Sequence, residues 1–274
     1  MEPGNGGGTL KAMIAKRSLT LALTGLLTLP IAACSDRSDD TDGATKSDSS
    51  SGSAERETPG AELSTVVFLG DSVAQGQALP LAAAFEGSDV DFHSMASTGG
   101  GNIVGPAAEK QWETLPDEIA SAEPSTVIYQ ITTYDWGSEQ EQRDAYERLL
   151  TTVTEADAKL VFVTMPPIKP DDFYKPHMDD LNRAPDVAQA VAEGSPEQAV
   201  VLDANEVWGD TYQQNRDGVA DRSSDGIHTC PQGAARFTDW LLTELEELYP
   251  DFTPPAPEDW ANAGWSGDEH FKIC

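Results

Sequence analysis

The stretch that decides the fold is residues 64–76, which read STVVFLGDSVAQG. Its first part is a short apolar run with β-branched side chains, which is typical of a fully buried strand. The run ends at Gly70, and Asp71 and Ser72 follow at the start of a segment, 72–85, that suits a helix. The sequence therefore predicts a strand that passes through a tight turn directly into a helix, with Ser72 at the junction.

The same alternation continues along the chain. Four further apolar runs predict strands, at 90–94, 126–131, 159–164 and 199–202. Helices are expected between and after them, at 106–122, 139–156, 176–192 and 233–248. We expect Pro185 to interrupt one of these helices, because proline lacks the N–H that a helix interior needs. Strands that alternate with helices indicate an α/β fold, a three-layer αβα sandwich around a five-stranded parallel sheet.

The N-terminal part of the sequence has no globular pattern. Residues 1–33 combine basic residues with a Leu-rich run shorter than the ~20 residues of a spanning helix, which indicates a signal peptide. That run ends in IAAC at 31–34, which resembles a bacterial lipobox, in which the cysteine is lipidated. An ordinary signal peptide with a chance cysteine at position 34 is the alternative. Residues 34–60 are rich in Ser, Asp and Gly, and predict a disordered tether after a lipidated Cys34.

These segments predict the location of the protein. We expect export, anchoring to the outer face of the bacterial cell membrane as a lipoprotein, and an extracellular domain over 61–274 with a Trp-containing C-terminal tail. The chain has 47 acidic and 17 basic residues and a formal net charge of −30. Phosphate binding depends on Lys and Arg, so this charge argues against nucleic acid as a partner. We expect a monomer that contacts the membrane only through its lipid.

Two cysteines remain once Cys34 is assigned to lipid. They are Cys230 and Cys274, and disulfides persist in exported proteins. We therefore expect a Cys230–Cys274 disulfide that ties the tail beside His228. Two free thiols are the alternative.

A second group of chemically useful residues lies before the last predicted helix, in the sequence DGIH at 225–228. A hydroxyl nucleophile needs a base, and an imidazole base needs a carboxylate that fixes its tautomer. In a tight turn, this spacing lets Asp225 reach one ring nitrogen of His228 and leaves the other for Ser72. Taken alone, Gly-Asp-Ser is often only a turn with a capping residue. The joint occurrence of the two motifs is much rarer.

Together these segments resemble the SGNH hydrolases, also called GDSL-type esterases, from about residue 65 to 247. The resemblance implies a flavodoxin-like strand order 2-1-3-4-5, with Ser72 as the nucleophile and Asp225 and His228 as its partners. It also implies no cofactor, and an oxyanion hole that includes a glycine N–H from the family's second motif. Gly99 aligns best with that glycine, and Gly100 is the second choice.

The third motif departs from the family. SGNH hydrolases usually have Gly-x-Asn-Asp there, and the Asn side chain donates to the oxyanion. Here residues 132–137 read TTYDWG, which places Tyr134 at the Asn position and keeps Asp135. The hydroxyl of Tyr134, Thr132 or Thr133 can replace the missing donor; alternatively Tyr134 only packs. We therefore include Tyr134 and Asp135 among the candidate oxyanion and substrate-binding residues.

These observations predict a serine esterase that hydrolyses short acyl esters. Similar departures in the third motif occur in SGNH domains associated with surface-glycan acyl transfer, so O-acetyl groups on surface glycans are a candidate substrate. An O-acyltransferase to sugar hydroxyls, and a non-catalytic glycan-binding module, remain alternatives. The chain has no Gly-x-Ser-x-Gly elbow, no His-Glu-x-x-His and no Cys-x-x-Cys pair, so we expect neither an α/β-hydrolase site nor a metal. Three tryptophans either form a sugar-stacking platform or pack on the domain: Trp208, Trp260 and Trp265.

Overall fold

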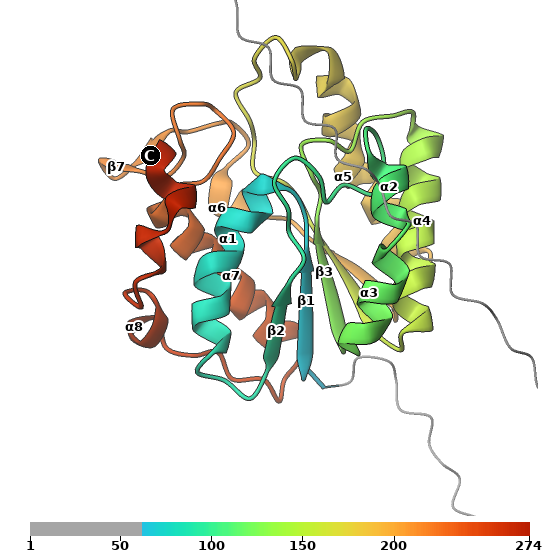
Figure 1. Cartoon of the computed structure of the whole chain (residues 1–274), viewed down its shortest axis with the longest axis horizontal. Coiled ribbons are helices and arrows are strands. Elements are labelled where there is room, and N and C mark those ends of the chain that lie inside the picture. The colour runs from blue at the N-terminus through green and yellow to red at the C-terminus, as the bar shows by residue number, and fades with distance from the viewer. Residues whose placement is uncertain (1–61) are drawn as a thin grey trace, which may run out of the picture. The chain divides into compact units, whose positions relative to one another are not determined.

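A five-stranded parallel sheet organises the part of the chain that the computed structural model describes, residues 62–274 (Figure 1). The strands lie in the order β2-β1-β3-β4-β5. Their bounds are Thr65–Leu69 (β1), Asp91–Ser94 (β2), Thr126–Gln130 (β3), Lys159–Val163 (β4) and Ala199–Leu202 (β5). The predicted fold class and strand order are confirmed. The predicted signal peptide, Cys34 and the tether lie outside the described residues.

Helices cover both faces of this sheet. Their bounds are Ser72–Phe85 (α1), Ala108–Trp112 (α2), Leu115–Ala122 (α3), Glu139–Glu155 (α4), Met178–Glu193 (α5), Asn205–Trp208 (α6), Pro231–Leu248 (α7) and Pro257–Trp260 (α8). A small antiparallel pair, β6 (Asn215–Arg216) and β7 (Val219–Ala220), precedes α7. In Figure 1, α1 and α7 lie on one side of the sheet, and α3 and α4 on the other.

The three central strands β1, β3 and β4 are buried from both sides, which explains why they read as continuous hydrophobic runs. The edge strand β2 is mostly exposed. On β1, Val66 and Phe68 pack with α1 and α7, whereas Val67 and Leu69 pack with α3, α4 and α5. Side chains alternate between the two faces along a strand. One short strand therefore contributes to two separate cores.

Pro116 and Pro185 affect the helices differently from the sequence prediction. The predicted helix 106–122 is divided into α2 and α3, because Pro116 has no N–H to donate to the carbonyl of Trp112; it lies in the first turn of α3, where that N–H is not needed. The expected interruption at Pro185 is wrong, since α5 continues through it. Only one helical hydrogen bond is lost there, and buried residues on both sides, such as Leu181 and Val187, keep the helix on the sheet.

The C-terminal tail is attached to the domain by the Cys230–Cys274 disulfide, as predicted, which closes a sequence separation of 44 residues. Trp260 is only 2% exposed and lies in the core beside α1 and α7, and Trp208 is 6% exposed. Both tryptophans therefore pack on the domain. The surface platform considered for them is not formed.

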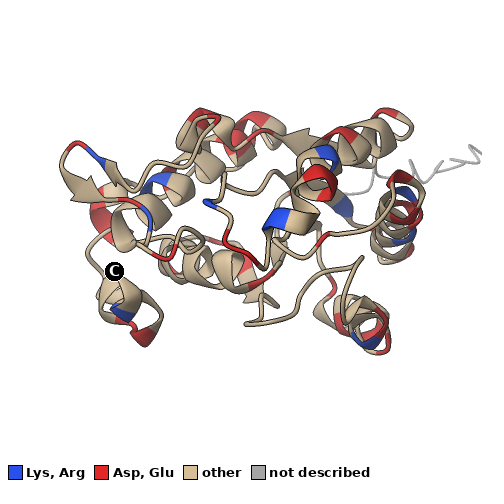
Figure 2. Ribbon diagram, turned by 90° about the horizontal axis from the view of Figure 1, so that it is seen from above, with Lys and Arg blue, Asp and Glu red and all other residues tan. Residues whose placement is uncertain are grey.

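Acidic residues are spread over most helices and loops of the described domain, and basic residues are few (Figure 2). Among residues 62–274, no helix is long and apolar enough to cross a membrane. The same residues contain no group of three or more His, Cys, Asp or Glu side chains arranged to hold a metal ion.

Candidate active site

Ser72 lies where β1 ends and α1 begins, at the edge of the sheet formed by the carboxyl ends of the strands. Asp71 is the N-cap of α1, and its Oδ1 accepts a hydrogen bond from the Val73 N–H at 2.9 Å. An aspartate at this position stabilises the first helical turn. Ser72 therefore opens a helix whose free N–H groups and dipole favour negative charge.

Three predicted residues meet at this point. His228 Nε2 lies 2.9 Å from Ser72 Oγ, and His228 Nδ1 lies 2.7 Å from Asp225 Oδ2. A carboxylate can only accept, so Nδ1 carries the proton and Nε2 is free to accept the Ser72 O–H. The His228 side chain is a quarter exposed, at 25%, so solvent and ligands can reach it.

The turn that carries Asp225 and His228 is held by its own carboxylate. Asp225 Oδ1 accepts hydrogen bonds from the N–H groups of Ile227, at 2.8 Å, and His228, at 3.1 Å. Partial burial raises the pKa of Asp225, but these hydrogen bonds and the His228 ring outweigh it, so the pKa lies below its usual value. Gly226 has φ +86°, and a Cβ there would lie 2.8 Å from Lys169. The Asp-Gly-x-His turn is therefore preorganised, with its carboxylate ionised.

The glycine-rich loop after β2 lies against the same strand end. Gly101 has φ +80°, and a Cβ there would lie 1.9 Å from the carbonyl oxygen of Gly70, so only glycine fits. Among the described residues, none accepts a hydrogen bond from the backbone N–H of Ser72 or Gly99. These donors remain available for an oxyanion. The sequence pointed to Gly99 and Gly100, and it missed the close backbone contact that requires Gly101.

Tyr134, at the family's Asn position, belongs to an aromatic cluster. Its ring centroid lies 5.7 Å from that of Trp136, 6.2 Å from that of Tyr174 and 6.4 Å from that of Phe173. Burial raises the pKa of the Tyr174 phenol, which lies beside Thr133 and Tyr134. Tyr174 and Phe173 come from the β4–α5 loop, and no motif in the sequence indicated that this loop would cover the third motif.

Asp135 differs from the substrate contact expected for it. It is fully buried, and its carboxylate accepts hydrogen bonds from the hydroxyls of Tyr129, Thr132 and Tyr146 at 2.7–2.9 Å. Burial raises the pKa of Asp135 to about 7, although these hydrogen bonds lower it. The Tyr129 hydroxyl oxygen also accepts a hydrogen bond from the Ile103 N–H, at 3.3 Å. Through Tyr129, Asp135 therefore connects its own loop to the loop that carries Ile103, and its carboxylate is buried away from any ligand.

A groove of about 710 Å³ lies beside the aromatic cluster. Trp112, Trp136 and apolar residues form its walls together with one arginine, Arg148, and four carboxylate side chains: Glu109, Glu141, Asp144 and Asp180. Arg148 lies over the Trp112 ring at 4.0 Å. The groove thus combines aromatic surface with several hydrogen-bond acceptors.

The tail and the arginine before the turn also reach the site. The expected disulfide predicted that the tail would lie beside His228, whereas no sequence motif indicated Arg222. The His270 ring packs against that of His228, with centroids 5.9 Å apart, and burial lowers the His270 pKa. Arg222 donates to the carbonyls of Ile227 and Pro167.

No protein-family model and no curated protein matches this sequence. Solved structures do. A protein described as an acylhydrolase from Bacteroides fragilis aligns with a TM-score of 0.54 at 14% identity, covering 72% of this chain and 97% of that one. A GDSL-like lipase from Bacteroides thetaiotaomicron aligns with a TM-score of 0.51 at 11% identity, covering 67% and 88%. A protein described as an SGNH hydrolase from Slackia heliotrinireducens aligns with a TM-score of 0.49 at 18% identity, covering 66% of this chain and 97% of that one.

The fold of this chain is that of the SGNH hydrolases, as the strand order and the two structures with the higher TM-scores establish. The resemblance expected from the sequence motifs is confirmed at the level of the fold.

Proposed function

We propose that the protein is a serine ester hydrolase that acts on short acyl esters through Ser72, His228 and Asp225. The observation that carries the proposal is the position of the His228 ring, which contacts Ser72 Oγ at 2.9 Å and Asp225 at 2.7 Å. Hydroxyl, imidazole and carboxylate in this sequence of contacts form the constellation that activates a serine.

In the proposed reaction, Ser72 Oγ attacks the ester carbonyl carbon while His228 Nε2 takes the hydroxyl proton. Asp225 stabilises the imidazolium that forms. As the tetrahedral intermediate collapses, the C–O bond to the alcohol breaks and His228 returns the proton to the leaving oxygen. His228 then deprotonates a water molecule that attacks the acyl-Ser72 ester, and the second collapse releases the carboxylic acid and restores the Ser72 hydroxyl.

The negative charge that develops on the ester oxygen needs donors in fixed positions. Backbone N–H groups of Ser72 and Gly99 supply them in this proposal, supported by their lack of an acceptor among the described residues. The Tyr134 hydroxyl is the candidate for the third donor, in place of the family's Asn.

We further propose that the alcohol part of the substrate is a sugar, with O-acetylated surface glycans as the candidate class. The groove beside Trp136 supports this, because its carboxylates can accept hydrogen bonds from sugar hydroxyls and its aromatic walls suit the apolar face of a sugar ring. The lipid anchor expected at Cys34 would place the enzyme at the cell surface.

The test is hydrolysis of an aryl acetate by the purified protein, beside its Ser72→Ala variant. The wild type should turn over, and the variant should lose at least about 10³-fold in kcat, in line with removal of a serine nucleophile. A fluorophosphonate should label the wild type once, at Ser72. Equal turnover by both proteins, or no turnover and no labelling of the wild type, would contradict the proposal.

The substrate class is tested separately, with an acetylated oligosaccharide as the acyl donor and a deacetylated one as the acceptor. Release of acetate with kcat/KM above that for the aryl acetate supports the glycan esterase. Acetyl groups recovered on the acceptor, with little free acetate, identify the acyltransferase. Glycan binding without turnover identifies the non-catalytic module.

A further inference from the structure

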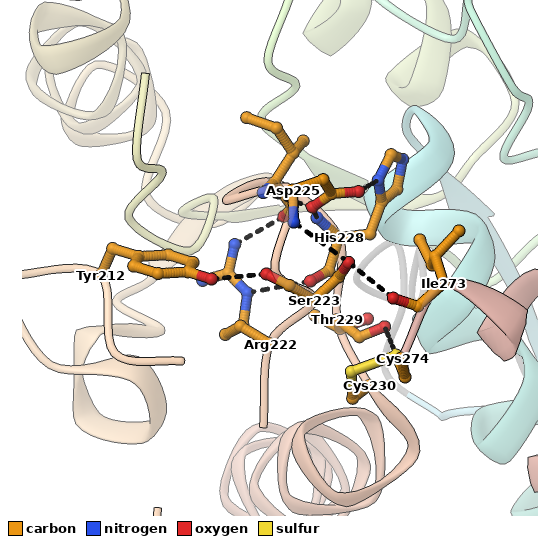
Figure 3. The surroundings of a disulfide bond; sticks show 10 residues. Tyr212, Arg222, Ser223, Asp225, His228, Thr229, Cys230, Ile273 and Cys274 are labelled. Atoms are coloured by element: carbon orange, nitrogen blue, oxygen red, sulfur yellow. Dashed lines mark hydrogen bonds and ion pairs between the residues drawn. A yellow bond between two sulfur atoms is a disulfide. The ribbon is translucent and has the colours of Figure 1, made fainter. Parts of the chain in front are cut away.

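The catalytic turn rests on a buried arginine. Arg222 is 2% exposed, and its backbone forms an isolated antiparallel bridge with Thr229, so residues 223–228 form a short loop closed at its base. The loop contains both Asp225 and His228. Figure 3 shows the Arg222 side chain running beneath this loop.

The guanidinium of Arg222 donates to three backbone carbonyls. Nη2 lies 2.6 Å from the Ile227 oxygen, Nη1 lies 2.9 Å from the Pro167 oxygen, and a longer contact of 3.4 Å joins Nε to the His228 oxygen. Two of these carbonyls belong to the catalytic loop, and the third belongs to the β4–α5 loop. A planar fork of N–H donors is the geometry that allows one side chain to hold several acceptors at once.

Burying the charged Arg222 side chain costs free energy, so its hydrogen-bond partners need to be identified. The ion pairs of residues 62–274 do not include Arg222. The rings of Trp208 and Tyr212 lie 5.4 Å from it. Burial lowers the Arg222 pKa to about 10, so the side chain stays protonated at neutral pH. A charge buried without a direct carboxylate partner is destabilising unless its hydrogen bonds are satisfied, and here the loop carbonyls satisfy them.

The neighbours of Arg222 hold the same loop. The Tyr212 hydroxyl donates to the Ser223 oxygen at 2.5 Å, and the Ser223 N–H donates to the His228 oxygen at 2.9 Å. Lys169 N–H, on the β4–α5 loop, donates to the Gly226 oxygen at 2.8 Å. Arg222 and Ser223 thus hold the backbone of His228, and Lys169 holds the turn beside it, while the His228 ring extends toward Ser72.

We propose that Arg222 is a positioning residue for the Ser72–His228–Asp225 site: its guanidinium, by holding the carbonyls of residues 227 and 228 to that of Pro167, fixes the distance between the His228 ring and Ser72. This inference rests on the proposed function. A displacement of about 1 Å in a reacting group can cost about 10²-fold in rate, so a clamp on the backbone of the base affects turnover without touching substrate.

The test compares Arg222→Lys with Arg236→Lys. Arg236 also donates to a backbone carbonyl, that of Val207 at 2.9 Å, and pairs with Asp221, but it has no hydrogen bond to residues 223–228. Lysine keeps the charge and loses the fork. Arg222→Lys should lower kcat for an aryl acetate by about 10- to 100-fold with KM within about twofold, measured well below Tm. Arg236→Lys should lower Tm with kcat within about twofold of wild type.

A second readout does not depend on activity. The Nδ1 proton of His228, held by Asp225, is observable as a low-field resonance in proton NMR spectra. It should be present in wild type and in Arg236→Lys, and lost or shifted in Arg222→Lys. If wild type hydrolyses no ester, the proposed function fails, and this resonance still decides whether Arg222 positions His228.

The proposal is overturned if Arg222→Lys lowers Tm but leaves both kcat and the His228 resonance unchanged, because Arg222 then only stabilises the fold. Should Arg222→Lys not fold, Tyr212→Phe tests the same clamp more gently, since it removes the bond to the Ser223 oxygen and keeps the ring beside Arg222. A fall in kcat at constant KM supports the proposal, and an unchanged kcat and resonance overturn it.

Discussion

Thr133 donates two hydrogen bonds to Asp71 Oδ2, from its backbone N–H at 2.8 Å and from its hydroxyl at 2.7 Å. The other oxygen of Asp71 caps α1 at Val73. One buried carboxylate therefore joins the turn that carries Ser72 to the loop that replaces the family's third motif.

The first prediction concerns this junction. Thr133→Val keeps the shape and the backbone N–H but removes the hydroxyl donor to a buried carboxylate. Hydrogen bonds to charged groups contribute about 1.5–3 kcal/mol, so the free energy of unfolding should fall by that amount. The turnover of the aryl ester should fall several-fold, since Ser72 follows Asp71. Urea unfolding and kinetics measure the two effects. Thr151→Val, at an exposed site on α4, is the control and should change neither the free energy of unfolding nor the turnover. A Thr133→Val variant as stable and as active as wild type would disprove the role of the Thr133–Asp71 contact.

The second prediction concerns Tyr134. If its hydroxyl donates to the oxyanion, Tyr134→Phe should lower kcat by at least about 10-fold with little change in KM, because such a donor acts mainly in the transition state. Tyr134→Asn introduces the family's usual side chain at the same position. A Phe variant as active as wild type, together with a faster Asn variant, would show that Tyr134 only packs against Trp136 and Tyr174.

The third prediction follows from the raised pKa of Asp135, about 7 compared with 3.8 for the unperturbed group. Between these values the folded state holds a proton that the unfolded state has released, so the contribution of Asp135 to stability falls as pH rises. Asp135→Asn removes this titration. The stability difference, wild type minus variant, should therefore decrease from pH 4 to pH 7, as measured by urea unfolding at several pH values. A difference independent of pH would contradict the raised pKa.

The fourth prediction concerns the tail. Cys274→Ala removes the disulfide to Cys230, and loss of a native disulfide typically costs about 2–5 kcal/mol. The variant should melt at a lower temperature. Intact-mass analysis of the non-reduced wild type should show no alkylatable thiol at either position. The Ser223 hydroxyl donates to the Ile273 carbonyl at 3.1 Å, so the tail contacts the loop that carries Asp225 and His228, and the activity of the variant should fall as well. Two free thiols in freshly purified wild-type protein would contradict the pairing.

The fifth prediction concerns anchoring, which the residues at 31–34 suggest. Cys34→Ser should release the mature protein from membrane fractions into the medium, because the lipid holds it there. Immunoblots of separated fractions test this, with the Cys274→Ala variant as a control that should stay with the membrane. Wild-type protein already free in the medium would mean that Cys34 is not lipidated.

The sequence by itself determined the sheet and predicted the three residues that meet at the candidate site. The buried strands are short apolar runs whose periodicity depends only on local geometry, and residues 65–72 specify a strand, a turn and a helix start in direct succession. The short spacing of Asp225 and His228 likewise ties their contact to one local turn. Such features are readable because each depends on neighbours along the chain.

Only the tertiary structure decided which distant side chains support these residues. Thr133 bonds to Asp71 across 62 residues of sequence, and Arg222 bonds to Pro167 across 55. Asp135 is buried where β3, the loop after it and α4 pack together. Their hydrogen bonds exist because packing excludes water from those positions, and no local pattern encodes that exclusion. Pro185 shows the same limit: propensity predicts a break, but the buried face of α5 stabilises a continuous helix.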